Sequence, residues 1–228
     1  MSSKKNGSQP GKDNFTRYLV IGVVIIVLAI MIVPTVLSKS KGVSQATPSG
    51  IDANNGYAIS YNTEVKNVPV VDIYEDFQCP ICRQFEALNG EYINSLITEK
   101  KAVVNFHTLS FLGTESVRAA NAAACANEEG KFVNYHFALY ANQPATENSG
   151  EWSSEKLISI ADGVGIKSDS FKSCVKDLKF EGWVNKVADA GAKSQVQSTP
   201  TVYVGGKEID RNTEYFSADK FKAAVERG

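Results

Sequence analysis

The sequence predicts an α/β fold in which a β-α-β unit, a helical insertion and a β-β-α unit follow one transmembrane helix. Three observations in the 228-residue chain support this prediction. A short β-branched run over 68–74 leads into a helix pattern, a hairpin pattern over 201–209 precedes an amphipathic helix, and residues 18–38 are apolar and uncharged. The chain therefore combines a membrane segment with a domain large enough to bury its own core.

The apolar segment over 18–38 predicts a membrane anchor, because it matches the length of a helix that crosses the hydrocarbon layer. Four basic residues precede it and two follow closely. The positive-inside rule therefore places residues 1–17 in the cytoplasm and the rest of the chain outside. A cleaved signal peptide is the alternative. We favour an uncleaved anchor, because the run exceeds the usual apolar core of such peptides and no clear small-x-small cleavage site follows.

The segment over 39–56 is polar and rich in turn residues, so it predicts a flexible linker to a domain over 57–228. After residue 42 the chain carries 18 basic and 24 acidic side chains. A mildly acidic domain argues against nucleic acid as a partner, because nucleic-acid binding calls for a basic surface.

The elements of the domain follow from hydrophobic spacing and turn residues. Residues 68–74 and 102–109 predict two buried strands, and the helix expected between them, over 80–100, makes the pair parallel with a right-handed crossover. The helices predicted for the insertion cover 115–127, 131–142, 154–164, 169–178 and 180–193. The C-terminal unit is predicted as strands over 201–204 and 207–209 around Gly205-Gly206, then a helix over 217–227 with Ser217 as its N-cap.

The pair Cys79 and Cys82, in Cys79-Pro80-Ile81-Cys82, stands where the first strand meets the first helix. Two cysteines at this spacing can exchange dithiol for disulfide without moving the backbone. The attacking species is the thiolate, and a helix N-terminus favours its formation through unpaired N–H groups and the helix dipole. Pro80 suits the first helical position, where its missing N–H has no partner to lose. A strand, a CxxC motif and a helix in this order indicate a redox site.

The other two cysteines, Cys125 and Cys174, also lie in the part predicted to be exported. Disulfides form and persist outside the cytosol, so an even count of four is consistent with two bridges. The sequence alone leaves open whether this second pair is bonded, because the distance between their Cα atoms is not encoded in the spacing.

Three features together resemble the DsbA-like branch of the thioredoxin superfamily: the stretch 74–82, the helical insertion, and Ser198-Thr199-Pro200 before a strand. Within that branch the sequence is most similar to membrane-tethered extracytoplasmic oxidoreductases of Gram-positive, especially actinobacterial, type. The resemblance covers about residues 57–228. It implies a thioredoxin fold whose βαβ and ββα halves are separated by a helical insertion at about 113–194.

The resemblance also implies roles for individual residues. Pro200 is expected in the cis form facing the CxxC motif, and an X–Pro bond tolerates cis far better than other peptide bonds. The backbone of Thr199 would then bind an extended peptide in strand fashion. Cys79 is expected to attack and form mixed disulfides, and the shielded Cys82 to resolve them. The family likeness assigns Cys125 and Cys174 to a structural disulfide, with two free thiols as the alternative.

Two departures from the family pattern concern proton and charge chemistry. Ile81 stands where many DsbA-like proteins have a histidine that stabilises the thiolate, which suggests a less strongly oxidising site. Ile73 stands six residues before the first cysteine, where thioredoxins and classical DsbA carry a buried acid. Glu75 and Asp76 are the acids near the motif that can take over proton transfer, although carboxylates there are more often solvated or cap the following helix.

The sequence thus predicts an extracytoplasmic oxidase that introduces disulfides into exported polypeptides, with no cofactor. Its reoxidation calls for a quinone-linked membrane partner, VKOR-like or DsbB-like. A disulfide reductase or isomerase uses the same chemistry, and the sequence does not decide the direction. A metal-binding module that uses the CxxC motif is a third, weaker alternative, because zinc sites usually pair two closely spaced motifs. The two histidines, His107 and His136, are expected to be packed, hydrogen-bonded residues rather than ligands.

Overall fold

The computed structural model describes residues 42–228, and residues 43–228 form one compact unit. The predicted cytoplasmic N-terminus and membrane anchor lie outside the described residues. Within the described part of the chain, no helix has both the length and the apolar character needed to span a membrane.

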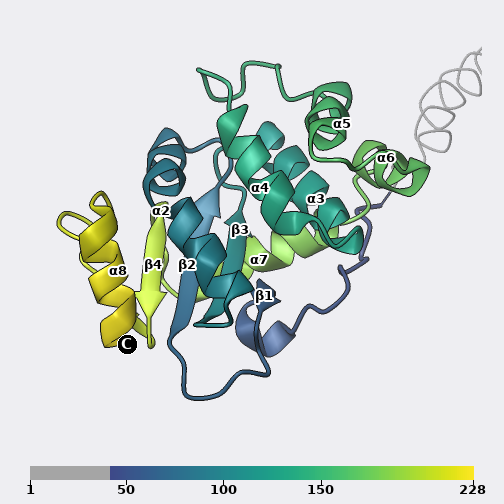
Figure 1. Cartoon of the computed structure of the whole chain (residues 1–228). Helices are drawn as coiled ribbons and strands as arrows, with labels where there is room; N and C mark the ends of the chain where they lie inside the picture. The colour runs from purple at the N-terminus through teal and green to yellow at the C-terminus, as the bar shows by residue number, and fades with distance from the viewer. Residues whose placement is uncertain (1–41) are drawn as a thin grey trace, which may run out of the picture. The chain divides into compact units, whose positions relative to one another are not determined.

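Over residues 42–228 the strands form one mixed five-stranded sheet in the order β1-β3-β2-β4-β5 (Figure 1). Strands β2 and β3 are parallel, as predicted, and the remaining pairs are antiparallel. The sequence analysis missed β1, a three-residue strand whose pattern is too short to recognise. The strand bounds are β1 (Ile59–Tyr61), β2 (Val70–Asp76), β3 (Val103–Leu109), β4 (Thr201–Val204) and β5 (Lys207–Glu208).

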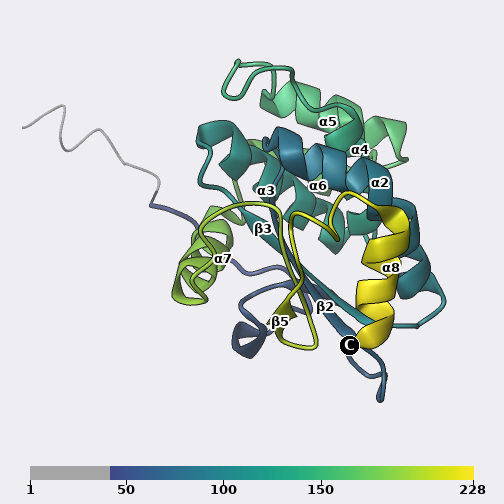
Figure 2. The same ribbon diagram turned by 90° about the vertical axis from the view of Figure 1, so that its left-hand side faces the viewer.

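Helices cover both faces of this sheet. Figure 2 shows α7 on one side of the sheet, with α2 and α8 on the other. The insertion helices α3 to α6 gather together beside the sheet in both views. The bounds are α2 (Pro80–Thr98), α3 (Thr114–Glu128), α4 (Phe132–Ala141), α5 (Ser154–Gly163), α6 (Asp169–Lys176), α7 (Glu181–Lys193) and α8 (Ala218–Arg227), with a 3-10 turn η1 (Ala53–Asn55). All predicted helices are confirmed, and Ser217 occupies the N-cap of α8 without a side-chain capping bond.

The central strand β2 fixes the position of the cysteines. Its residues Val71 and Ile73 are fully buried, because helices cover both faces of a sheet of this kind. Ile73 pairs with Phe106 on β3 and with Val202 on β4. Further along, Tyr74 pairs with Thr201, so the start of β4 lies beside the end of β2. That end of the sheet is where the CxxC motif follows β2.

The insertion is held to itself by a disulfide. Cys125 on α3 and Cys174 on α6 are bonded, with their Cα atoms 5.9 Å apart. Most of α3 is alanine, and its buried face lets neighbouring helices approach closely. Asn121 supports the same junction, since its side chain donates to the carbonyl of Cys174 and accepts the N–H of Phe180.

The described part of the predicted linker is hydrogen-bonded to the domain. Ser44 accepts the N–H of Gly182 and donates its hydroxyl to the carbonyl of Lys179. Ser49 donates its N–H to Glu128 on α3. A Cβ on Gly182 would lie 2.2 Å from the Ser44 oxygen, so only glycine permits this approach. From residue 44 onward the chain therefore packs on the domain, where the polar composition alone predicted a flexible tether.

Candidate active site

Cys79 and Cys82 sit at the start of α2, immediately after β2. Cys79 is the N-cap of α2 and Pro80 is in its first turn. Cys79 keeps 7% of its surface exposed and Cys82 none. Both are free thiols in the structure. The arrangement leaves the first sulfur at the protein surface and holds the second one turn inside, which suits an attacking and a resolving thiol.

Thr199 and Pro200 lie opposite the cysteines. The Thr199–Pro200 peptide bond is cis, and both residues are buried. The Cys79 thiol donates to the Thr199 carbonyl oxygen at 3.5 Å. The pairing of β4 with β2 brings these residues together across 120 positions of sequence.

The surroundings of the two sulfurs push their acidities apart. The pKa of Cys79 is lowered to about 6, chiefly by the hydrogen bond from Cys82, with help from Thr199 and from the N–H groups of Ile81 and Cys82. Burial raises the pKa of Cys82 well above its ordinary value, and the neighbouring Cys79 raises it further. At neutral pH the first sulfur is therefore a thiolate and the second a thiol, which is the asymmetry that directed exchange requires.

Asp76 is a buried acid that organises the turn between β2 and α2. Its carboxylate accepts bonds from the Gln78 N–H at 2.9 Å, the Ser116 hydroxyl at 2.6 Å and the Leu112 N–H at 3.2 Å. Burial raises the pKa of Asp76 to about 6, and these three donors oppose the rise. The carboxylate is thus fully engaged in joining β2 to α3 and to the loop before it, and it is not solvated.

Glu75 takes part in a second buried group, which we call the acid–imidazole cluster: Glu75 on β2, Glu86 on α2 and His136 on α4. The His136 Nε2 is hydrogen-bonded to the Glu75 Oε1. One atom of each residue lies within 4.8 Å of the others. Burial raises the pKa of Glu75 to about 8 and that of Glu86 well above its ordinary range. His136 is packed and hydrogen-bonded, as predicted.

Sequence analysis did not connect Glu86 or His136 with the cysteines. Glu86 is four residues after Cys82, and residues at this spacing share one face of a helix. That spacing was the available indication. His136 has no comparable indication, because only the packing of α4 against α2 brings it to the site.

Three cavities clarify where ligands and solvent reach the protein. One of about 710 Å³ adjoins the CxxC motif between α2 and α4, and its lining includes Pro80, Ile81, Glu86, Phe137 and Tyr140. Another of about 310 Å³ contains Asp72, Tyr74 and His107, and the His107 Nε2 contacts Asp72 at 3.2 Å.

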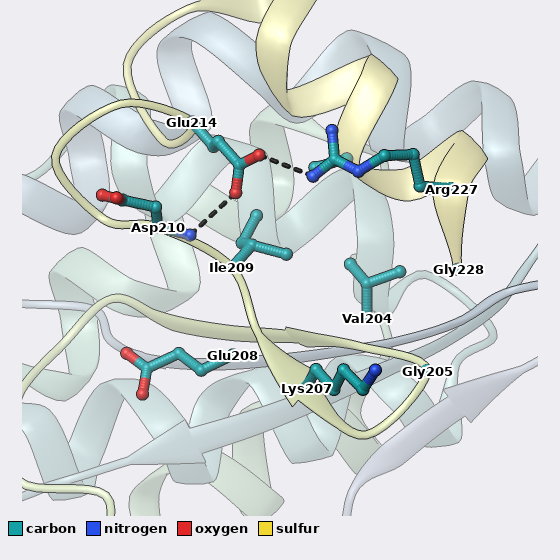
Figure 3. Close-up of a pocket in the computed structure, with 10 residues that line it drawn as sticks. Val204, Gly205, Lys207, Glu208, Ile209, Asp210, Glu214, Arg227 and Gly228 are labelled. Atoms are coloured by element: carbon teal, nitrogen blue, oxygen red, sulfur yellow. Dashed lines mark hydrogen bonds and ion pairs between the residues drawn. The ribbon is translucent and has the colours of Figure 1, made fainter.

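A third cavity, of about 520 Å³, lies between the β4–β5 hairpin and α8 (Figure 3). Glu214 bridges across it, accepting from Arg227 at 2.6 Å and from the Asp210 N–H at 2.7 Å (Figure 3). Its lining contains no cysteine, so it has no part in thiol chemistry.

The structure does not bring the two cysteine pairs together as one site. Cys125 and Cys174 are bonded to each other and lie in the insertion. Their sulfurs therefore offer no thiolates to a metal ion held by the CxxC motif, which removes the ligand set of the metal-binding alternative.

Comparison with known proteins places this geometry among thiol–disulfide enzymes. A family model described as thioredoxin matches residues 65–227. The disulfide bond formation protein D of Bacillus subtilis is 28% identical over 188 residues, covering 75% of this chain and 81% of that protein. The reduced DsbA of Mycobacterium tuberculosis superposes with a TM-score of 0.62 at 26% identity, covering 75% of this chain and 91% of that one.

A further solved structure shows the same fold at greater coverage. The MdbA protein of Actinomyces oris, a thiol-disulfide oxidoreductase, gives a TM-score of 0.70. It covers 84% of this chain and 97% of its own, at 24% identity.

Proposed function

The chain belongs to the thioredoxin family and is a DsbA-like protein disulfide oxidoreductase, and on that premise we propose that it is an extracytoplasmic oxidase that introduces disulfides into exported proteins. The observation that carries the oxidising direction is the lowered pKa of Cys79, to about 6. Stabilising the thiolate stabilises the reduced enzyme, and an enzyme with a stable reduced form is a stronger oxidant.

The proposed reaction begins with the Cys79–Cys82 disulfide. A substrate thiolate attacks the Cys79 sulfur, forming a mixed disulfide and releasing Cys82 as a thiolate. A second substrate thiol then attacks the substrate sulfur of that bond. The substrate leaves with a disulfide, and the enzyme is left with two reduced cysteines. The peptide approaches as an extended strand along Thr199, whose carbonyl already lies 3.5 Å from the Cys79 sulfur.

The buried Cys82 thiolate must be protonated when it leaves, because burial disfavours its charge. We assign this proton transfer to Glu75 rather than Asp76. Asp76 is held by three hydrogen-bond donors, whereas burial keeps Glu75 protonated at neutral pH, with a pKa of about 8. Cys125 and Cys174 serve as a structural disulfide in this scheme.

The proposed organisation keeps the domain at the membrane. Residues 1–17 are cytoplasmic, 18–38 form the anchor, 39–56 connect, and 57–228 form the thioredoxin-like catalytic domain. Reoxidation by a quinone-linked, VKOR-like or DsbB-like membrane protein fits this tethering, because enzyme and partner then share one membrane surface.

The redox potential of the Cys79–Cys82 pair tests the direction. We expect the full chain in detergent to lie closer to DsbA, at about −120 mV, than to thioredoxin, at about −270 mV. A value near that of thioredoxin would instead support the reductase. A Cys82→Ala variant should accumulate mixed disulfides with exported proteins, and a Cys79→Ala variant should accumulate none.

A further inference from the structure

The acid–imidazole cluster is a buried group with unmet hydrogen-bonding capacity. Glu75 and His136 are at most 1% exposed, and Glu86 is 5% exposed. Seven buried side-chain atoms within residues 42–228 lack a hydrogen-bond partner, and four of them belong to this cluster. They are Glu75 Oε2, both carboxyl oxygens of Glu86, and His136 Nδ1. Unpartnered buried polar atoms are rare in native proteins and often mark functional groups.

Two carboxyl groups this close in a dry site cannot both be charged. Each carboxylate would lack water and repel its neighbour, so at least one carboxyl keeps its proton. His136 is in contact with Glu75, and burial lowers the pKa of its imidazole. The cluster therefore holds protons at neutral pH and can give one up or take one back.

The cluster lies directly behind the resolving cysteine. Cys82 and Glu86 lie one turn apart on the same face of α2 and are both buried. The charge of Glu75 reaches Cys82 and raises its pKa. Cys82 itself has no exposed surface, so its proton must pass through neighbouring protein groups.

Glu86 connects this interior to solvent. It is the acidic residue in the lining of the cavity of about 710 Å³ between α2 and α4, which is also bounded by Phe137 and Tyr140. Thr199 and Pro200 are not part of that lining. A bound peptide on Thr199 would therefore leave the cavity open.

We propose that Glu86 carries protons between this cavity and Glu75, and that His136 positions Glu75 for the exchange with Cys82. The inference rests on the proposed function, because it supplies the proton that the resolving cysteine needs. When Cys82 leaves as a thiolate, Glu75 gives it a proton, Glu86 restores the proton to Glu75, and solvent in the cavity reprotonates Glu86. In the reverse direction Cys82 attacks a mixed disulfide, an S–S bond forms to Cys79, the other sulfur leaves with the electron pair, and the proton runs outward.

The ionisable groups around this route come from three elements. β2 contributes Glu75 and Asp76, and α4 contributes His136 and Tyr140. The start of α2 contributes Cys79, Cys82, Glu86 and, on the cavity wall, Arg83. Burial raises the pKa of the Tyr140 hydroxyl well above its ordinary value, so it stays neutral. Asp76 is engaged by its three donors, which leaves Glu86 as the acid that faces both Glu75 and the cavity.

The test oxidises the reduced full chain, in detergent, with dithiobis(nitrobenzoate), an aromatic disulfide that releases a coloured thiolate. Cys79 attacks first and releases one thiolate. Cys82 then closes the Cys79–Cys82 bond, releases a second thiolate and loses its proton. We expect Glu86→Gln to leave the first phase unchanged and to slow the second at least tenfold at neutral pH, with Glu86→Asp recovering part of the rate.

The pH profile separates a proton route from a structural effect. In the wild type the second phase should level off above the titration of the carboxyl pair. In Glu86→Gln it should keep rising tenfold per pH unit, because hydroxide must then remove the proton directly. Glu115→Gln is the matched control, since Glu115 is also a buried glutamate but bonds the backbone of Gly150 and Trp152. It should behave as the wild type.

An unchanged second phase in Glu86→Gln would overturn the inference while leaving the proposed function intact. A wild type that releases no second thiolate would overturn both. One equivalent of tightly bound zinc per chain would also overturn it, because a cation would then neutralise the carboxylates. If Glu86→Gln does not fold by circular dichroism, the infrared spectrum of the wild type decides. The protonated carboxyl band must change between the oxidised and reduced forms, and an unchanged band overturns the proton route.

Discussion

At the scale of single residues, the environment of Cys79 explains a moderate rather than an extreme thiolate. The stabilising groups are the Cys82 thiol, Thr199 and two backbone N–H groups. The residue between Pro80 and Cys82 adds no charge, because Ile81 is apolar and 45% exposed. The acidity of Cys79 therefore comes from hydrogen bonds and the helix N-terminus alone.

Ile81→His should make Cys79 more acidic. An imidazolium one turn from the sulfur favours the thiolate, so the pKa of Cys79 should fall by roughly one unit from about 6. The exposed position means that no core packing is lost. The thiolate absorbance in the ultraviolet, followed against pH, measures the shift. Ile81→Gln is the neutral control of similar size, and an equal shift in that variant would rule out a charge effect.

Glu75 should make the stability of the protein depend on pH. Its pKa is about 8 in the folded protein and has an ordinary value of 4.5. Between these values the unfolded chain loses the proton and the folded chain keeps it. Unfolding therefore becomes easier as pH rises from about 4.5 to about 8.

Glu75→Gln removes this titration. The free energy of unfolding of the wild type should fall relative to the variant by several kcal/mol across that interval, at about 1.4 kcal/mol per unit of pKa shift. Urea unfolding at a series of pH values gives the difference. Parallel curves for the two proteins would show that Glu75 titrates alike in the folded and unfolded states.

At the scale of elements, local sequence carried most of the fold but not the interior of the site. The strand, CxxC and helix order was legible because each element has its own spacing and turn residues. Strand β1 (Ile59–Tyr61) was missed because its three residues are defined only by pairing with β3. His136 was missed as a partner of Glu75 for the same reason, since 61 residues separate the two and only tertiary packing joins them.

The bond between α3 and α6 should be a stability element and not a redox element. The Cys125–Cys174 bridge spans 49 positions, and closing a loop of this length restricts the unfolded chain by about 4 kcal/mol. A Cys125→Ala/Cys174→Ala variant should lose roughly that amount in denaturant unfolding. Its rate of thiol exchange, measured while folded, should match the wild type. A loss of exchange with intact folding would contradict the separation of the two pairs.

At the scale of the whole molecule, the charge distribution and the redox chemistry agree. Six of the basic residues and one acid lie in the first 42 positions, and the remainder is acidic. Thiol oxidation needs an oxidising compartment, and the positive-inside rule puts the CxxC domain in such a compartment. The sidedness of the chain is therefore the property on which the oxidase proposal depends most directly.

Two reporter cysteines should reveal opposite sides of the membrane. In a chain with Cys79→Ser and Cys82→Ser, we would introduce either Ser8→Cys or Phe111→Cys. Phe111 is 52% exposed, so its replacement is readily labelled. A membrane-impermeant maleimide should label Phe111→Cys in intact cells and Ser8→Cys only after permeabilisation. Labelling of both in intact cells would contradict the orientation, and a shortened, unanchored chain would show that residues 18–38 act as a cleaved signal peptide instead.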